Sequence, residues 1–578
     1  MAPWIRAHPG DTSGAALAES GDVVARSVMS STLPEAMVSD RHDDLADDVD
    51  VHRGSGPGLP DEVDDAVAAL PSLISRGDLA AANALVRRFW FELLRSHGDE
   101  LRVALDAIPA AALRDHPLLT MMLGICYNGV PHKRARALRY FATAVRAARS
   151  GRPALDAVDR ALILVSESAV YRLVGRPARG VKPAHSAIRI LDGMSSAELE
   201  AVSSLPRVYS QAGVSLYYGG DLNGALAAFE SGLAESMDKR SSDGFGNLAM
   251  LAGIRALRGE LHEARVYIEL AHSPEWSDDQ RSMYTGTFYR IAEAISALEE
   301  FDPVAARAHL SAMVNDPRTI EHWITIATTE ALAALLSGRP GEGLSRLDAV
   351  AGSRSEGRSA AARGRLSATR ALLQLALGAR DAAGVILHRD ASPGPDRHIA
   401  QARVELVAGR SGSALRELGK IAGDDLPPRA VAEAMTIEAA ALLRLPSSVR
   451  STGVVEHLGS LLEHTGLRMP LALVPPADFG RLRAALVEQG FGGVFEGRDI
   501  RSVLAETTPA TILSEREQVV LAALLRHSSP TGIAAELVVS VNTVKTQLRS
   551  IYRKLGVSSR DEAIAVALDR HLLADRDG

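Results

Sequence analysis

Three strings near the carboxyl end decide the fold of this region: Leu513-Ser-Glu-Arg-Glu517, Ile533-Ala-Ala-Glu-Leu537 and Ser540-Val-Asn-Thr-Val-Lys-Thr-Gln-Leu548. Ser514 lies three residues before Glu517, which is the spacing of a capping box at the start of a helix. By the same reasoning, further helices are predicted to begin at Ser529-Pro530, at Ser540 and at Ser559, which lies three residues before Glu562. We therefore predict that residues 510–578 form a compact domain of four short helices with tight connections.

The third of these helices, Val541 to Leu555, is predicted to have two different faces. The apolar side chains at helical spacing, which should form the domain core, are Val541, Val544, Leu548, Ile551, Tyr552 and Leu555. The opposite face carries Asn542, Lys545, Thr546, Arg549 and Arg553.

The charge of this segment differs from that of the whole chain. The segment from Val541 to Arg560 has no acid and five basic residues, namely Lys545, Arg549, Arg553, Lys554 and Arg560. The whole chain has 64 Lys and Arg against 71 Asp and Glu, a net charge of -7. A local positive charge in an acidic protein favours contact with a phosphate backbone. A solvated basic face on a structural helix would give the same pattern.

The three strings, together with Ile551-Tyr-Arg-Lys-Leu-Gly-Val557 and Arg560, resemble the LuxR-type helix-turn-helix domain. The resemblance implies that the helix holding Thr543-Val-Lys545 is the recognition helix. It also implies roles for single residues: Lys545, Thr546 and Arg549 point toward base edges, Thr543 and Arg553 contact phosphates, and Val544 is structural. The implied partners are double-stranded operator DNA, a second copy of the chain paired through a last helix (Ala563 to Leu573), and RNA polymerase.

The sequence departs from this family's pattern at two places. Before the second helix the family usually has Gly-x-Ser-Asn-Lys-Glu-Ile, whereas this chain has His527-Ser-Ser-Pro-Thr-Gly-Ile533 and so lacks a lysine there. Gln547 stands where the family often has histidine. Contacts at the start of the second helix are therefore not carried over from the family.

Residues 61–489 show helical apolar spacing and a recurring glycine followed five residues later by a small residue. The pattern occurs at Gly77/Ala82, Gly175/Gly180, Gly220/Ala225, Gly259/Ala264, Gly338/Gly343, Gly378/Ala383 and Gly409/Ala414. Phe301/Ala306 stands where a member is missing, and a degenerate copy is expected around Gly129. Glycine can end one helix in the left-handed conformation, and a small residue lets the next helix pack closely.

The best copy, Tyr217 to Phe229, resembles a tetratricopeptide unit, although the spacing here is longer and looser than the usual period of about 34 residues. The predicted fold is thus all-α: an α-solenoid of tetratricopeptide-like helix pairs followed by the four-helix domain. Stacked pairs should contact only their neighbours and leave a concave surface for a ligand or partner. An irregular alanine-rich helical domain is the alternative.

Two further segments are predicted from composition. Residues 1–60 should be a disordered acidic tail, since Asp40 to Asp65 contains ten acids and two arginines. We interpret it as a solvated leader, with a binding tail as the alternative. Met29 or Met37 could also begin the chain, so residues 1–36 need not be translated. The string Gly490-Phe-Gly-Gly-Val-Phe-Glu-Gly-Arg-Asp499 predicts a flexible joint, with a linker over 490–509.

Several function classes find no support in the sequence. Gly175 to Lys182 misplaces the lysine of a phosphate-binding loop, and His262-Glu263 lacks the second histidine of a zinc protease. Cys126, the single cysteine, lies in an apolar run and is interpreted as a small core residue. We predict no catalytic residue, no metal and no cofactor. No apolar run is long enough for a membrane span, and the amino end does not resemble a secretory signal.

The leading hypothesis is a cytoplasmic, nucleoid-associated transcription regulator whose repeat domain senses a ligand or protein partner and controls operator binding. The chain resembles the MalT-like branch of LuxR regulators, without the nucleotide-binding module. The alternative is a repeat-based protein–protein scaffold with an accessory DNA-binding domain.

Overall fold

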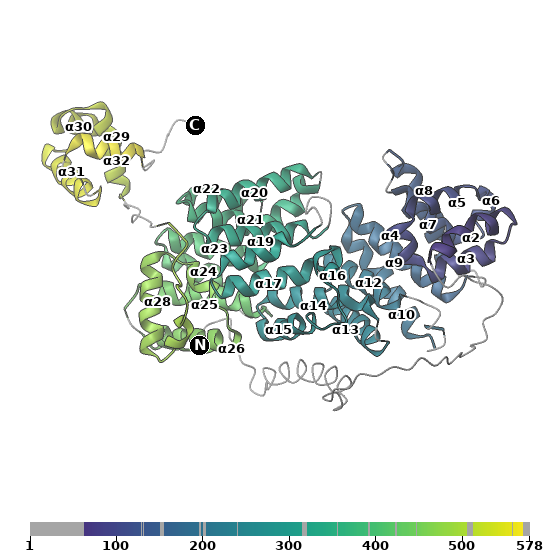
Figure 1. The fold of residues 1–578 in the computed structure, drawn as a ribbon. Coiled ribbons are helices and arrows are strands. Elements are labelled where there is room, and N and C mark those ends of the chain that lie inside the picture. The colour runs from purple at the N-terminus through teal and green to yellow at the C-terminus, as the bar shows by residue number, and fades with distance from the viewer. Residues whose placement is uncertain are drawn as a thin grey trace.

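The computed structural model describes residues 63–569, except for 129, 131, 151–154, 196–197, 200–203, 240, 315–320, 355, 391–393, 422, 424, 447, 506–512, 556 and 558. The predicted tail over residues 1–60, the alternative starts and Gly129 lie outside the described residues. Within the described part the chain forms helices and turns with no β-strand, so the predicted all-α fold class is confirmed (Figure 1). None of the described helices combines the length and apolar character needed to cross a membrane.

The first helices are α2 (Val63–Ser75), α3 (Leu79–Arg88), α4 (Trp90–Ser96), α5 (Gly98–Asp106), α6 (Ala110–Leu113), α7 (Pro117–Asn128) and α8 (Arg134–Arg149). They are followed by the pairs α9 (Ala157–Leu173) with α10 (Val181–Asp192), α12 (Leu205–Gly219) with α13 (Leu222–Asp238), and α14 (Phe245–Arg258) with α15 (Leu261–Leu270). The short α16 (Asp278–Ser282) precedes α17 (Thr287–Glu299) and its partner α18 (Pro303–Ser311).

The next pairs are α19 (Trp323–Leu336) with α20 (Pro340–Ser353), α21 (Ala360–Ala376) with α22 (Arg380–Arg389), α23 (Pro395–Val407) with α24 (Ser411–Gly419), and α25 (Pro428–Leu442) with α26 (Val449–Thr465). They are followed by α27 (Met469–Ala472) and α28 (Pro476–Glu488). Short 3₁₀ turns lie at Pro177–Gly180, Ser242–Gly244, Tyr284–Gly286, Glu356–Arg358 and Gly492–Phe495. The last four helices are α29 (Glu515–Arg526), α30 (Pro530–Leu537), α31 (Val541–Leu555) and α32 (Arg560–Asp569).

The glycine pattern marks the turns between paired helices, as predicted. All seven glycines have a left-handed backbone, with φ between +70° and +91°. The small residue five positions later is buried in every pair. Phe301 has φ +59° and Ala306 is buried, which confirms that this pair takes the place of the glycine pair missing from the series. The same geometry recurs at His132, with φ +64°, and buried Ala137, which joins α7 to α8.

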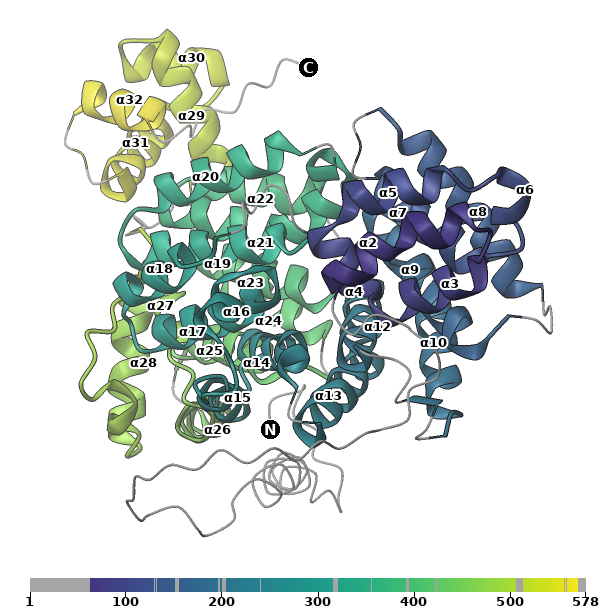
Figure 2. The ribbon, with the colours of Figure 1, turned by 45° about the vertical axis from the view of Figure 1, so that its right-hand side comes forward.

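The helix pairs follow one another in space, but the array also contacts itself at a distance. α14 contacts α17, and the contacts continue through α19, α21, α23 and α25. α25 then contacts α14 again (Figure 2). The prediction that each pair contacts only its neighbours is therefore wrong. Successive pairs are rotated relative to one another, so the array curves until helices far apart in the sequence meet.

A buried carboxylate joins the two ends of this closed path. Glu299, at the end of α17, is only 1% exposed. Its Oε1 accepts a hydrogen bond from Arg429 of α25, and its Oε2 accepts the backbone N–H groups of Arg468 (2.7 Å) and Met469 (2.8 Å). Arg429 also donates to the carbonyl oxygens of Ala256 (3.1 Å) and Leu257 (3.0 Å) at the end of α14. We call these interactions the Glu299 clasp.

The segment predicted as a flexible joint packs against the helical array over most of its length. Ile500 and Leu504 are buried, each in a different core cluster of the array. Val503 N–H donates to the carbonyl of Ala472 (3.0 Å), and the Ser502 hydroxyl donates to that of Val474 (2.6 Å). Buried apolar side chains hold this segment despite its many glycines. The part of 490–509 left for a linker is therefore residues 506–509, which the structure does not describe.

The four last helices have their own apolar core. It contains buried side chains from all four helices, among them Leu521, Ile533, Val544 and Ala563. α31 contacts each of α29, α30 and α32, and α29 likewise contacts each of the other three helices. A small core of this kind fixes the orientation of α31 relative to the helices beside it.

Candidate nucleic-acid interface

Serine caps begin the four last helices at the positions that the sequence predicts. The Ser514 hydroxyl accepts the N–H of Glu517, and the Glu517 carboxylate accepts the N–H of Ser514 (2.6 Å), which completes the capping box of α29. The hydroxyls of Ser529, Ser540 and Ser559 accept the N–H groups of Gly532, Thr543 and Glu562, at 3.2, 3.1 and 3.2 Å. These bonds satisfy amide groups that the first turn of a helix leaves free.

The turn between α30 and α31 has an unusual backbone. Val538 ends α30 in the left-handed conformation, with φ +54° and ψ +47°. A β-branched side chain is strained there, because its Cβ approaches the following carbonyl oxygen. Val539 N–H then donates to the carbonyl of Ala534 (3.1 Å), and α31 begins two residues later. The tight connection is as predicted, whereas the strained valine could not be recognised from the sequence pattern.

The apolar face of α31 packs as predicted except at Val541 and, in part, at Tyr552. Val544, Leu548, Ile551 and Leu555 are buried in the core of the last four helices. Tyr552 is only partly buried against this core. Val541 is 37% exposed, so its prediction as a core residue is wrong. It is the first residue of the helix and, at about 100° per residue, lies about 40° round the helix from Lys545. It therefore stands at the edge of the buried face.

The other face of α31 is open to solvent. Asn542, Thr543, Lys545, Thr546 and Arg549 are all exposed. The Thr543 hydroxyl lies 2.8 Å from that of Ser540, and the Thr546 hydroxyl donates to the carbonyl of Asn542 (2.9 Å). Lys545 and Arg549 have no hydrogen-bond or ion-pair partner among the described residues. Two cationic groups one helical turn apart are thus available to a ligand. The side chain of Arg553 is not among those that the structure describes.

Two of the five basic residues counted in the sequence are bound within the domain. Lys554 Nζ donates to Glu517 Oε2 (2.6 Å). Arg560 donates to the carbonyl of Leu524 (3.0 Å) and contacts Asp561 (3.2 Å). The local charge of the segment therefore overstates the charge that the open face presents. Glu517 lies 37 positions from Lys554, and Leu524 lies 36 positions from Arg560. No local signal in the sequence indicates these two contacts.

Glu517 joins α29 to α31 and was predicted only as a capping residue. It is 4% exposed and also accepts a hydrogen bond from the Ser550 hydroxyl (2.7 Å). Burial alone would raise the pKa of this carboxyl. The hydrogen bonds from Lys554, Ser514 and Ser550 outweigh burial and lower the pKa to about 2. The carboxylate is therefore ionised at neutral pH and holds the two helices together.

Comparison with known proteins matches this part of the chain to one family. Residues 511–567 match the family described as bacterial regulatory proteins, luxR family. These residues form a LuxR-type helix-turn-helix domain. The match includes all of α29, α30 and α31 and most of α32.

The curated relatives resemble the chain over short segments of 63 to 75 residues. The transcriptional regulatory protein YdfI of Bacillus subtilis is 44% identical over 63 residues, which is 11% of this chain and 30% of that protein. The probable transcriptional regulatory protein NarL of Mycobacterium tuberculosis is 44% identical over 75 residues, or 13% and 34%. The HTH-type transcriptional regulator MalT of Serratia proteamaculans is 42% identical over 64 residues, or 11% and 7%. The chain thus spans at most about a third of the length of these relatives.

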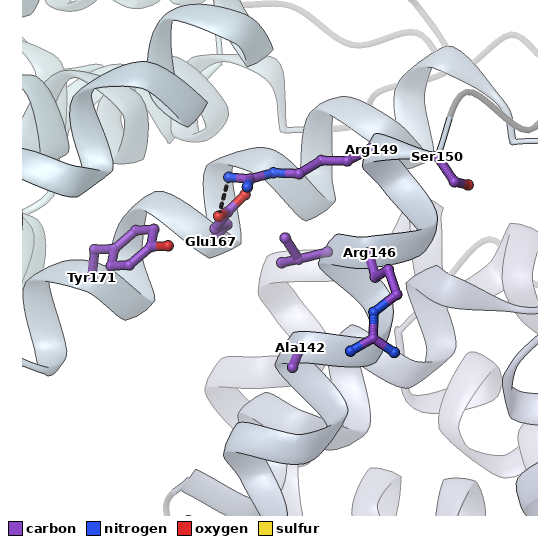
Figure 3. A pocket seen from close by; sticks show the side chains of 7 residues that line it. Ala142, Arg146, Arg149, Ser150, Glu167 and Tyr171 are labelled. Carbon is purple, nitrogen blue, oxygen red and sulfur yellow. Dashed lines mark hydrogen bonds and ion pairs between the residues drawn. The ribbon is translucent and has the colours of Figure 1, made fainter.

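A second candidate site lies between α8 and α9 in the helical array. An open groove of about 560 Å³ is lined by Ala142, Val145, Arg146, Arg149, Ser150, Glu167 and Tyr171 (Figure 3). Arg149 donates to the buried carboxylate of Glu167 (2.5 Å). Burial raises the pKa of Glu167, and Arg149 and Tyr171 only partly counteract this. Arg146 extends from the same helix as Arg149 and is exposed (Figure 3).

The described residues offer no cluster of three or more His, Cys, Asp or Glu side chains suited to a metal ion. Cys126 is partly buried, and burial raises the pKa of its thiol to about 12. It is therefore protonated at neutral pH and is a poor nucleophile.

Proposed function

We propose that this protein is a sequence-specific DNA-binding transcription regulator whose recognition helix is α31. One observation carries the proposal: within a LuxR-type domain, α31 is buried along one face and presents on the other Lys545 and Arg549, which are exposed and have no partner in the part of the chain that the structure describes. A helix held in this way can enter the major groove of DNA while its packed face keeps it in place. The curated relatives, all of them named as transcription regulators, support the same function.

Within this proposal the residues of α31 have separate roles. Lys545, Thr546 and Arg549 contact base edges, while Thr543 and Arg553 contact phosphates and set the register. Asn542 lies on the same exposed face and contributes to the contact. The protein binds as a dimer through α32 and the residues after it, with recognition helices roughly 34–36 Å apart. Double-stranded operator DNA is the partner, RNA polymerase is a further contact, and the site of action is the nucleoid.

The test is a binding titration with duplex DNA selected by the full-length protein from a random pool. Lys545→Ala and Arg549→Ala should each weaken binding to the selected duplex on the order of 10- to 100-fold, because each removes a contact to a base. Arg516→Ala is the matched control, since Arg516 is an exposed cation on α29 of the same domain. Equal affinities for all four proteins at fixed salt would refute the roles assigned to Lys545 and Arg549.

We further propose that the helical array, residues 61–489, senses a ligand or protein partner and controls DNA binding by the domain over 510–578. The groove between α8 and α9 supports this, because it combines cations, a tyrosine and a buried carboxylate beside apolar side chains. Such a mixture suits a small polar ligand. A thermal-shift screen of small polar compounds, repeated with Arg146→Ala, tests the groove. Capture of a protein instead, with no small-molecule shift, would favour the scaffold hypothesis.

A further inference from the structure

The start of the recognition helix carries an exposed apolar surface. Val538, Val539 and Val541 are 89%, 41% and 37% exposed. Single exposed valines are common in proteins, but no other stretch of four residues in the described chain exposes three large apolar side chains. We call these three residues the valine patch. Its position, in the turn before α31 and at the first residue of that helix, calls for a physical reason.

The position of Val541 relates the patch to the basic face. Val541 and Lys545 are four residues apart on one helix, so their side chains are neighbours. The amino-terminal residues of a recognition helix are those that reach base edges in the major groove. A valine there cannot form a hydrogen bond with a base. The one apolar group that a base pair displays in the major groove is the C5-methyl group of thymine.

The backbone of the turn supports a role for the patch. Val538 is held at φ +54°, where a valine is strained, although its exposed side chain forms little of the core. Strained residues of this kind persist where the surrounding structure or the function requires them. Here the strained turn directs the chain into α31 with Val539 and Val541 on the outside. An alternative residue without this strain, such as glycine, would remove part of the apolar surface.

We propose that the valine patch, through Val541, packs against the C5-methyl group of a thymine adjacent to the base pair that Lys545 contacts. The operator then favours thymine at that position. This inference rests on the proposed function, because α31 has to lie in the major groove for the contact to form.

The experiment replaces each thymine of the selected duplex by deoxyuridine, which removes the methyl group and keeps base pairing. With the full-length wild-type protein, replacement at one position of a half-site should weaken binding about threefold to fourfold, the equivalent of one buried methyl group, and the equivalent position of the other half-site should behave alike. With Val541→Ala the same replacement should have a clearly smaller effect, because the two Cγ methyl groups of the valine are lost. Val519→Ala is the matched control, because Val519 is an exposed valine on α29 of the same domain and should keep the full effect.

The possible results separate this inference from the function on which it rests. If no duplex is enriched in the selection, the proposed function itself fails. If a duplex is bound and weakened by Lys545→Ala, but no deoxyuridine replacement matters, the thymine contact is refuted while DNA binding stands. If the deoxyuridine effect persists in Val541→Ala and disappears in Val539→Ala, the assignment to Val541 is refuted. Circular dichroism of each variant checks that the helices are retained.

Discussion

The carboxylate of Glu517 should contribute a large part of the stability of the LuxR-type domain. It accepts hydrogen bonds from the Ser514 N–H (2.6 Å), the Ser550 hydroxyl (2.7 Å) and Lys554 Nζ (2.6 Å). Glu517→Gln keeps the size of the side chain but removes its charge. The amide of glutamine has a single oxygen, which can take the place of only one of the two carboxylate oxygens, and this neutral oxygen accepts more weakly from the Lys554 ammonium. We expect this change to destabilise the domain by about 2 kcal/mol.

The pH dependence gives an independent limit on this contribution. The pKa of Glu517 is about 2 in the folded protein, below its ordinary value of 4.5. A carboxyl whose folded pKa is lowered stabilises the protein above its unfolded pKa, and this stability is lost as the pH falls toward 2. At roughly 1.4 kcal/mol per pH unit, the shift corresponds to about 3 kcal/mol at neutral pH as an upper bound. The loss should lie between about pH 5 and pH 2 and should be absent in Glu517→Gln.

Hydrogen–deuterium exchange of the full-length protein, resolved by mass spectrometry, measures this effect locally. At pH 7, amides of α29 and α31 in Glu517→Gln should exchange about 30-fold faster than in the wild type, the equivalent of about 2 kcal/mol. Asp561→Asn is the control, because its carboxyl is 90% exposed and should matter little. If exchange in α29 and α31 is the same in Glu517→Gln and the wild type, the carboxylate does not hold these helices together.

Three further predictions concern strain, packing and closure of the array. Val538→Gly should stabilise the LuxR-type domain by up to about 1 kcal/mol, because relief of the left-handed strain exceeds the entropy cost of glycine; faster exchange in α30 would contradict this. Ala225→Leu should lower the melting temperature, because Ala225 is fully buried and overpacking there should reduce the free energy of unfolding by about 1–3 kcal/mol. Ala142→Leu, at an exposed position, should leave the melting temperature unchanged. Equal melting temperatures for the two variants would refute the close packing at Ala225. Glu299→Ala should cost about 3 kcal/mol, because it removes the carboxylate partner of Arg429, whose side chain is only 13% exposed, and it should speed exchange in α25 and α27. Unchanged exchange in these helices would mean that the Glu299 clasp does not close the array.

The roles proposed for Lys545 and Arg549 depend both on their spacing in the sequence and on the contacts of the folded domain. Their spacing places them on one helix face in the sequence, and that part of the site was predictable. Their freedom from partners was not, because Lys554 and Arg560 looked equivalent in the sequence and are bound inside the domain. Val541 shows the same limit: its spacing fits the buried face, but the end of the helix extends beyond the core that would cover it.

Features that depend on neighbours within a few residues were predictable from the sequence. Ser514 and Ser540 cap helices with bonds that reach three residues, and Gly220 or Gly259 ends a helix because a single residue has to adopt positive φ. Even Phe301, without a glycine, could be placed by the spacing around it. The energies of such features are local, so a short stretch of sequence is enough to predict them.

Contacts between groups far apart in the sequence became known only from the folded arrangement of the helices. Arg429 contacts Glu299 although 130 positions separate them in the sequence. The segment from Ile500 to Leu504 packs on the array, although the glycine-rich residues 490–499 before it predict a flexible joint. Closure of the array follows from small rotations between successive pairs, which add up over the length of the chain. A single repeat does not specify that sum. Burial of an ion pair or of an apolar side chain therefore depends on the whole arrangement, and no pattern within one helix can indicate it.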